Sequence, residues 1–222
     1  MPANVEFQGD IAIIRMDDGK ANAINPTMLE ALNNCLDEAE AKAKAIILVG
    51  RDQRFSGGFD LKLMMGLPGD EVAALVKGGG RLAMRLYASP VPIIAACTGH
   101  AIAMGCFLLL SSDYRIGAAG PYKIGANESA INMVLPVFAL ELLKDRLSPR
   151  HLSHAGISAN LYDPDGARDA GFLDEVVESE AVFETALAMA KQLSAVSGPA
   201  YASNKKLLRK HVLETVTPTV TP

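Results

Sequence analysis

Short apolar runs alternate along the chain with segments whose apolar residues recur every three or four positions. Each run is almost continuously apolar instead of strictly alternating, which is typical of β-strands covered on both faces. The runs are Ile11 to Met16, Ala45 to Gly50, Pro92 to Cys97, Tyr114 to Ala118 and Phe172 to Val177. Buried strands separated by helices predict an α/β fold with a parallel sheet.

The first helical pattern follows the first apolar run. Asn25 and Pro26 stand at its start, where an N-cap side chain and a first-turn proline are both favourable. Its apolar positions are Met28, Leu32, Cys35, Leu36 and Ala39. The pattern predicts an amphipathic helix with one face on the core.

The C-terminal part is predicted to be a pair of helices, the first over 182–193 and the second from Pro199 to about Leu213. The last residues, Thr215 to Pro222, read TVTPTVTP. Because proline removes a backbone donor and clashes with the preceding turn, we expect this tail to be frayed. We therefore expect a core over residues 1–178 and a helical portion with a frayed tail over 179–222.

The segment from Leu86 to Ser112 contains no Asp, Glu, Lys or Arg and is long enough to span a bilayer. Pro90 and Pro92 interrupt its start, and Thr98-Gly99-His100 interrupts its middle. A buried strand, a turn and a buried helix explain the segment better than a membrane span.

Composition excludes several classes of protein. Half of the 222 residues are hydrophobic and 21% are charged, which is a globular and not a disordered profile. The net charge of −4 provides no positive field for a nucleic-acid backbone, so we expect neither nucleic acid nor membrane as a partner.

Cys35, Cys97 and Cys106 lack the spacing of a zinc site or a disulfide framework. With no secretory signal at the N-terminus, a cytoplasmic protein with reduced thiols is expected.

Two glycine-containing segments follow predicted strands: Phe55 to Leu61 (FSGGFDL) and Thr98 to Leu110 (TGHAIAMGCFLLL). Glycines between a strand and a helix allow backbone N–H groups to face a common point, where they could hold a developing oxyanion. Ordinary tight turns are the alternative interpretation. Neither segment has the glycine spacing of a dinucleotide-binding or P-loop motif.

Together with three further motifs, these segments resemble the crotonase superfamily, and most closely the enoyl-CoA hydratase/isomerase family. The resemblance covers about residues 5–210. The five motifs, in order, are KANAIN (20–25), RFSGGFDLK (54–62), PIIAACTGHAIAMGC (92–106), SSDYRIG (111–117) and GANESAINMVLP (125–136). It implies a spiral of ββα units with a helical C-terminal trimerisation region, and a homotrimer or a dimer of trimers.

The resemblance also implies the chemistry of an acyl-CoA thioester whose carbonyl oxygen becomes an enolate oxygen. The backbone N–H groups of Phe59 and Met104 match the family's two oxyanion donors. The path of the CoA moiety falls on Ala23, Asp60, Leu61 and Lys62. No permanently bound cofactor and no metal are implied, since the substrate itself carries coenzyme A.

The acid/base residues separate reactions within the family. Hydratases resemble one another in using two glutamates, but here Phe107 stands at the position of the first. Glu128 is the only carboxylate in residues 125–136 and matches the isomerase-like spacing to Pro136. A single carboxylate suits an isomerase that moves a double bond from the 3- to the 2-position of an enoyl-CoA.

Several alternatives stay open at this point. The chain could catalyse hydration or another crotonase-type reaction on a CoA thioester, or bind acyl-CoA without turnover. Glu128 could instead be a solvated loop residue or a partner for Arg115 or Lys123. A serine hydrolase using Ser56 or Ser129 is disfavoured, because no G-x-S-x-G motif is present.

A basic cluster and the histidines remain. The basic residues could meet a CoA phosphate, although such a run is more often a solvated helix face. They are Lys205, Lys206, Arg209 and Lys210. His151 and His154 have no carboxylate or cysteine at a spacing that would complete a metal site, and for them and for His100 packing is the expected role.

Overall fold

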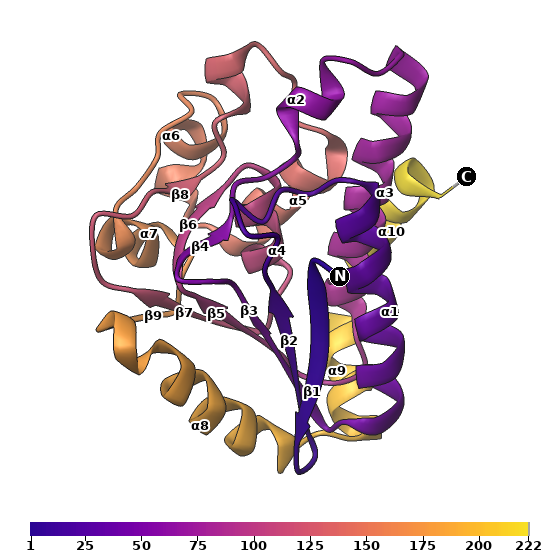
Figure 1. Ribbon diagram of the computed structural model, residues 1–222, viewed down its shortest axis with the longest axis vertical. Coiled ribbons are helices and arrows are strands. Elements are labelled where there is room, and N and C mark those ends of the chain that lie inside the picture. Colours follow the sequence, from indigo (N-terminus) through magenta and orange to yellow (C-terminus); the bar gives the residue numbers. More distant parts are fainter. Residues whose placement is uncertain (222) are drawn as a thin grey trace.

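A computed structural model gives the fold of the chain and describes residues 1–221. Its central element is a six-stranded sheet (Figure 1). In spatial order the strands are β1 (Ala3–Gln8), β2 (Ile11–Met16), β3 (Ala45–Val49), β5 (Ile93–Cys97), β7 (Tyr114–Ala118) and β9 (Glu175–Val177). Only β1 and β2 pair antiparallel, so the predicted parallel sheet is confirmed.

The last predicted strand is shorter than the apolar run that suggested it. Phe172 and Leu173 are buried but lie outside the sheet, because both of their N–H groups donate to the Ala167 carbonyl of the preceding helix. Gly171, with a φ of 105°, reverses the chain at that helix end. β9 therefore begins only at Glu175.

A second sheet of three parallel strands runs beside the first. It consists of β4 (Gln53–Ser56), β6 (Gly99–Ile102) and β8 (Ile124–Gly125), which sequence patterning had not indicated. These strands follow β3, β5 and β7 respectively, and a helix follows each of them. The repeated unit is the ββα turn of the predicted spiral.

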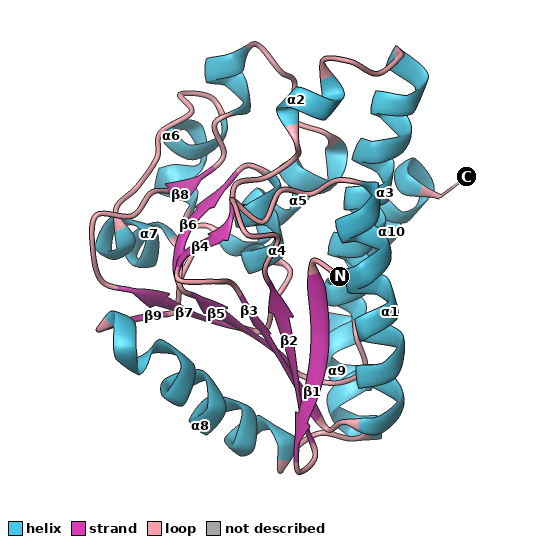
Figure 2. Ribbon diagram, in the orientation of Figure 1, coloured by secondary structure: helices cyan, strands magenta, loops and turns pink. Residues whose placement is uncertain are grey.

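Helices cover both faces of the main sheet (Figure 2). They are α1 (Pro26–Lys42), α2 (Leu61–Met64), α3 (Gly69–Ala88), α4 (Met104–Leu110), α5 (Val137–Arg146), α6 (Leu152–Gly156), α7 (Pro164–Ala170), α8 (Val182–Ser194), α9 (Pro199–Leu208) and α10 (Lys210–Val220). Three 3₁₀ helices lie at Glu128–Ile131, Pro149–His151 and Ser179–Ala181. The predicted N-cap of α1 is confirmed, since the Asn25 side chain accepts from the Met28 N–H at 2.9 Å.

Alternate residues of the parallel strands point to two separate cores. Ile13, Ile47 and Ile94 pack toward α8, whereas Ile14 and Ile46 belong to the larger core on the opposite face. Burial on both faces is the reason why the strands are almost continuously apolar. The charge-free segment forms β5, β6 and α4, and within residues 1–221 we find no helix with the length and apolarity that a membrane crossing requires.

The prediction of a frayed C-terminal tail is wrong for residues 215–220, which are helical, and Pro222 lies outside the described residues. The second C-terminal helix breaks at Arg209, and α10 then continues through Pro218 to Val220. Val212, Val216 and Val220 recur at helical spacing and are buried where α10 packs on α3 and α5. Pro218 removes one hydrogen bond from the helix, but the burial of this apolar face outweighs that loss.

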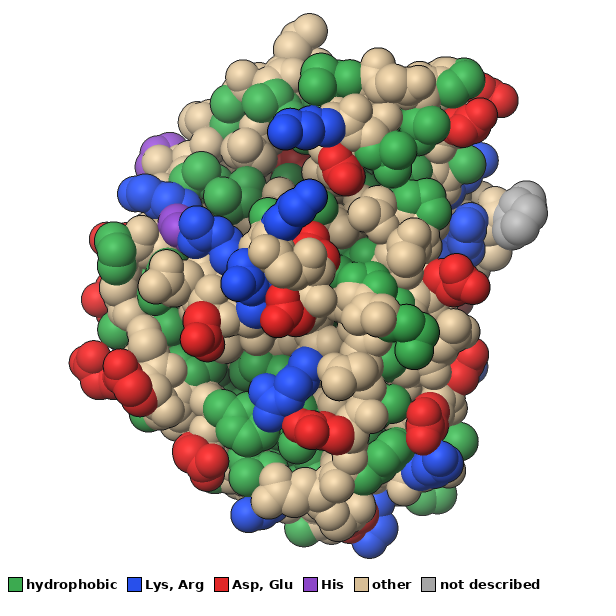
Figure 3. Space-filling view, in the orientation of Figure 1, with side chains coloured by type: hydrophobic (Ala, Val, Ile, Leu, Met, Phe, Trp, Pro, Cys, Tyr) green, Lys and Arg blue, Asp and Glu red, His purple; other side chains and the backbone are tan. Residues whose placement is uncertain are grey.

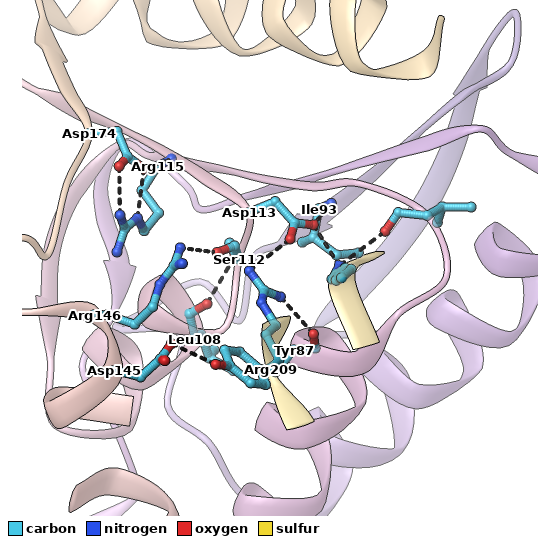
Figure 4. Close-up of polar contacts among 12 residues, drawn as sticks. Tyr87, Ile93, Leu108, Ser112, Asp113, Arg115, Asp145, Arg146, Asp174 and Arg209 are labelled. Carbon is cyan, nitrogen blue, oxygen red and sulfur yellow. Dashed lines mark hydrogen bonds and ion pairs between the residues drawn. The ribbon is translucent and has the colours of Figure 1, made fainter. Parts of the chain in front are cut away.

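The basic cluster is divided between the interior and the surface. Lys205 Nζ lies 2.6 Å from one oxygen of Asp113 and Arg209 Nη2 lies 2.9 Å from the other, and all three side chains are nearly buried. Figure 4 shows that Arg209 also reaches the carbonyl of Tyr87 in α3. Lys205 and Arg209 thus join the C-terminal helices to the strand that begins after Asp113, and they do not lie on a solvated face. Lys206 and Lys210 are exposed.

Replacing Asp113 should test how much this buried ion cluster stabilises the fold. Asp113→Ala would leave Lys205 and Arg209 buried without their carboxylate, and we expect the free energy of unfolding to fall by about 3 kcal/mol. Asp165→Ala, which breaks an exposed pair with Arg168, should change it by less than about 1 kcal/mol. Urea denaturation of both variants measures the difference, and equal effects would contradict a structural role for the cluster.

Candidate active site

Three chain segments meet at one edge of the second sheet. The turns that follow β4, β6 and β8 begin at Gly57, Ala103 and Ala126. Because the carboxyl ends of adjacent parallel strands lie at the same edge of a sheet, these turns are neighbours. The sequence-predicted residues Phe59, Met104 and Glu128 all lie in or directly after them.

A pocket with about 610 Å³ of empty space, partly open to solvent, lies at this edge. Its walls are mostly apolar and come from the three turns, α3, α4 and α5. Among the lining residues are Phe59, Leu61, Phe107, Asn127, Glu128 and Phe138. Apolar walls around a few polar groups are typical of a site for a small organic molecule.

The turn after β4 is held by the loop that precedes α1. Ile24 donates its N–H to the Gly58 carbonyl at 2.8 Å, and its own carbonyl accepts from the Asp60 N–H at 3.1 Å. In this parallel bridge the Phe59 N–H points away from Ile24. Ala23 lies directly before the bridge, and its N–H is occupied by the Asp18 carboxylate at 3.0 Å.

Close packing brings the turn after β4 against the start of α4. Gly58 has a φ of 87°, and a Cβ there would lie 2.8 Å from the Ile102 carbonyl oxygen and 3.2 Å from the Met104 nitrogen. Ala103 adopts a φ of 52°, a conformation that an alanine rarely takes. Within residues 1–221, neither Phe59 nor Met104 donates its N–H to a backbone carbonyl, so both donors are available beside the pocket.

Glu128 is the ionisable side chain of the pocket and is only 7% exposed. Burial raises the pKa of its carboxyl above the ordinary value, and within the described residues its Oε2 is buried without a hydrogen-bond partner. The alternatives for Glu128 fail. It is not solvated, Arg115 binds Asp174 at 2.6 Å instead, and Lys123 is exposed.

Apolar and thiol groups surround this carboxylate. Phe107 is buried in α4, three residues after Met104, and packs edge-on against Phe138 with the ring centres 5.7 Å apart. The pKa of the fully buried Cys106 thiol is raised by burial and further by the nearby charge of Glu128. The charged form of Glu128 is therefore poorly solvated by the protein around it.

Of the residues predicted for the CoA path, Leu61 lines the pocket, and Asp60 and Lys62 are its neighbours in the chain. Asp60 caps α2, since its carboxylate accepts from the Leu63 N–H at 3.1 Å. Leu61 is 45% exposed, Met65 of the same turn is 82% exposed, and Lys62 is exposed beside them. Figure 3 shows hydrophobic side chains gathered on the upper part of that face, where α2 lies.

Part of the lining carries no signal in the sequence. Val76 of α3 and Phe138 of α5 reach the pocket from helices outside the five motifs, and no local pattern marks them. Asn127 also lines the pocket, and its place next to Glu128 in one motif was a signal that could have been used.

The histidines lie outside the pocket. His100 accepts from the Lys123 N–H at 3.0 Å and packs edge-on against Tyr122, and burial and nearby Arg54 and Lys123 lower its pKa. His151 and His154 both face the Tyr162 hydroxyl at 3.4 Å. In the part of the chain described here, residues 1–221, no group of three or more His, Cys, Asp or Glu side chains is arranged to hold a metal ion.

Comparison with known proteins gives consistent matches over nearly the whole chain. A family model described as enoyl-CoA hydratase/isomerase matches residues 6–221. A solved structure of an enoyl-CoA hydratase/isomerase family protein from Pseudomonas syringae superposes with a TM-score of 0.96 at 41% identity, covering 99% of this chain and 95% of the other.

Curated relatives carry two different names. Human mitochondrial enoyl-CoA delta isomerase 1 is 30% identical over 90% of this chain and 68% of its own length. A probable enoyl-CoA hydratase of Bacillus subtilis is 32% identical over 89% of this chain and 78% of its own length.

The buried carboxylate of Glu128, which has no hydrogen-bond partner at Oε2 within residues 1–221, should lower the free energy of unfolding. Because the pKa is raised in the folded state, the fold binds more protons than the unfolded chain above pH 4.5, and its stability falls as pH rises through the raised pKa. Glu128→Gln removes the buried charge and should raise the free energy of unfolding at neutral pH by about 1 kcal/mol.

Urea denaturation at several pH values measures this gain, which should shrink as the pH is lowered toward 4.5. Glu184→Gln, an exposed position on α8, is the matched control and should show no such gain. A Glu128→Gln protein less stable than wild type at neutral pH would contradict the assignment of an unpaired buried carboxylate.

Proposed function

The chain belongs to the enoyl-CoA hydratase/isomerase family, and we propose that within this family it is an isomerase that moves a double bond from the 3- to the 2-position of an enoyl-CoA. The observation that carries the proposal is the composition of the pocket. Glu128 is the carboxylate lining it, and Phe107 occupies the position where the hydratase-like pattern has its other glutamate.

The reaction needs one group that takes and returns a proton. Glu128 removes a proton from C2 of the 3-enoyl thioester, and the electrons of the broken bond move through the carbonyl to form a dienolate. The protonated Glu128 then donates to C4, and the double bond forms between C2 and C3. No water, oxidant or reductant is consumed, so a single carboxylate suffices.

The raised pKa of Glu128 supports this role. A carboxyl group whose charged form is poorly solvated is a stronger base than one in water. Once protonated, it holds the proton long enough to donate it to C4. The rings of Phe107 and Phe138 keep water away from the dienolate.

The backbone N–H groups of Phe59 and Met104 are the proposed donors to the dienolate oxygen. Such donors stabilise a developing oxyanion more than the neutral carbonyl, and removing one costs about 3 kcal/mol in a transition state. Preorganisation is supported by the close contact of Gly58 with the start of α4 and by the unusual backbone of Ala103. Ala23, Asp60, Leu61 and Lys62 are proposed to border the CoA path at the pocket rim.

The homotrimer or dimer of trimers implied by the motifs stays a prediction. Leu207 and Leu208 of α9 are 70% and 85% exposed, which supports contacts with other copies through the C-terminal helices.

Hydration is the second candidate function, favoured by the name of the Bacillus subtilis relative. Adding water to a 2-enoyl-CoA calls for a group that activates the water as well as one that protonates C2. In the pocket described, Phe107 stands where the first of these would act.

Mixing the purified protein with a 3-enoyl-CoA and following the absorbance of the conjugated 2-enoyl thioester tests the isomerase. We expect Glu128→Gln to lower kcat at least about 100-fold, because the amide cannot accept and return the proton. Ser129→Ala changes the exposed neighbour and serves as the matched control, with near wild-type turnover expected.

The other outcomes separate the alternatives. Loss of 2-enoyl-CoA absorbance on addition of the protein would indicate a hydratase. Tight acyl-CoA binding in calorimetry without turnover of either substrate would indicate a non-catalytic binder. Equal turnover by wild type and Glu128→Gln would rule out Glu128 as the proton shuttle.

A further inference from the structure

Three consecutive glycines, Gly78, Gly79 and Gly80, lie in the middle of α3. Glycine is among the least favourable residues in a helix interior, so local preference opposes a helix at this point. A run of this kind inside a well-formed helix calls for a reason in the packing around it.

Gly79 faces the two residues whose N–H groups are the proposed oxyanion donors. A Cβ at this position would lie 2.5 Å from Cζ of Phe59 and 3.3 Å from Sδ of Met104, both closer than the 3.4–4 Å of ordinary contact. The side chains of both donor residues therefore rest on the same bare stretch of helix backbone.

The neighbouring glycines have other partners. A Cβ at Gly80 would meet Val220 at 2.7 Å and Phe138 at 2.8 Å, whereas one at Gly78 would meet mainly the end of the Leu29 side chain at 3.0 Å. Only the middle glycine of the run contacts Phe59 and Met104. The triplet thus offers a control of the same chemistry one residue away.

Phe59 and Met104 differ in how their side chains could move away from a Cβ at position 79. Met104 is fully buried, so its side chain cannot turn out into solvent. Phe59 is half-buried and lines the pocket, so the pocket is a space into which its ring can move. A side chain at position 79 would push the ring into the space that the thioester needs beside the two N–H groups.

We propose that Gly79 is a positioning residue of the oxyanion site. Its bare backbone seats the Phe59 ring against α3, which keeps the ring out of the pocket and lets the thioester carbonyl reach the N–H groups of Phe59 and Met104. The inference rests on the proposed function, because it takes these two N–H groups as the oxyanion donors.

The experiment compares Gly79→Ala with Gly78→Ala, with Phe59→Leu and with the double variant Gly79→Ala/Phe59→Leu. Alanine has a higher helix propensity than glycine. Helix propensity therefore gives no reason for Gly78→Ala or Gly79→Ala to lose thermal stability. Leucine at position 59 lacks the ring atom that meets position 79 but keeps the backbone N–H, so the double variant relieves the contact.

Two readouts are needed. The first is kcat/KM with a 3-enoyl-CoA, which should fall about 10- to 100-fold in Gly79→Ala, as expected for a displacement of about 1 Å at the reacting group. The second is the infrared stretch of an isotope-labelled hexanoyl-CoA carbonyl. Hydrogen bonds from the two N–H groups should shift it on binding, and the saturated chain cannot react.

We expect the carbonyl shift to be present in wild type and Gly78→Ala, weakened in Gly79→Ala, and restored in the double variant. For kcat/KM, Gly78→Ala should stay within about twofold of wild type, and the double variant should recover to the level of Phe59→Leu alone. Recovery on shortening Phe59 is a result that a general disturbance of α3 would not produce.

Two results would overturn the proposal for Gly79. One is a Gly79→Ala enzyme with wild-type kcat/KM and carbonyl shift. The other is a loss in Gly79→Ala that shortening Phe59 does not restore. Absence of any carbonyl shift in the wild-type complex would instead overturn the oxyanion assignment under the proposed function, and the inference with it.

Discussion

The parallel pairing of β4, β6 and β8 is the constraint on which the site depends. Each of these short strands continues the chain from a strand of the main sheet, and each ends in a turn at the same edge. That edge receives one segment with Phe59, one with Met104 and one with Glu128, although the three lie far apart in the sequence. A shift in the register of β6 would move the segment with Met104 relative to the segments on either side of it.

Unfavourable local features are concentrated around this edge. Ala103 has a strained backbone, Glu128 buries a carboxylate oxygen that has no partner within residues 1–221, and Gly79 weakens the helix that it belongs to. Each is expected to lower stability, and under the proposed function each has a use: directing an N–H group, raising a pKa or making room for a ring. The remainder of the chain supplies the stability that allows them, through strands buried on both faces and the ion cluster around Asp113.

The C-terminal helices tie this stable part to the pocket. Arg209 contacts the Tyr87 carbonyl at the end of α3, and Val220 packs against Gly80 in the middle of the same helix. Phe138, which also packs against Gly80, lines the pocket. The segment that reads as a proline-rich tail is therefore part of the support for the pocket wall.

The sequence by itself determined the elements whose signal is local. The apolar run from Ile11 to Met16 became β2 without change, and Asn25 capped α1 as expected, because burial and capping act on residues adjacent in the chain. Motif order brought out Phe59, Met104 and Glu128, and the family is confirmed by comparison. Only the tertiary structure decided that α10 passes through Pro218, that Lys205 is buried against Asp113, and that α3 runs through three glycines. In each of these cases, contacts with residues distant in the sequence outweighed a local preference. A pattern along the chain does not show which distant residues will be in contact.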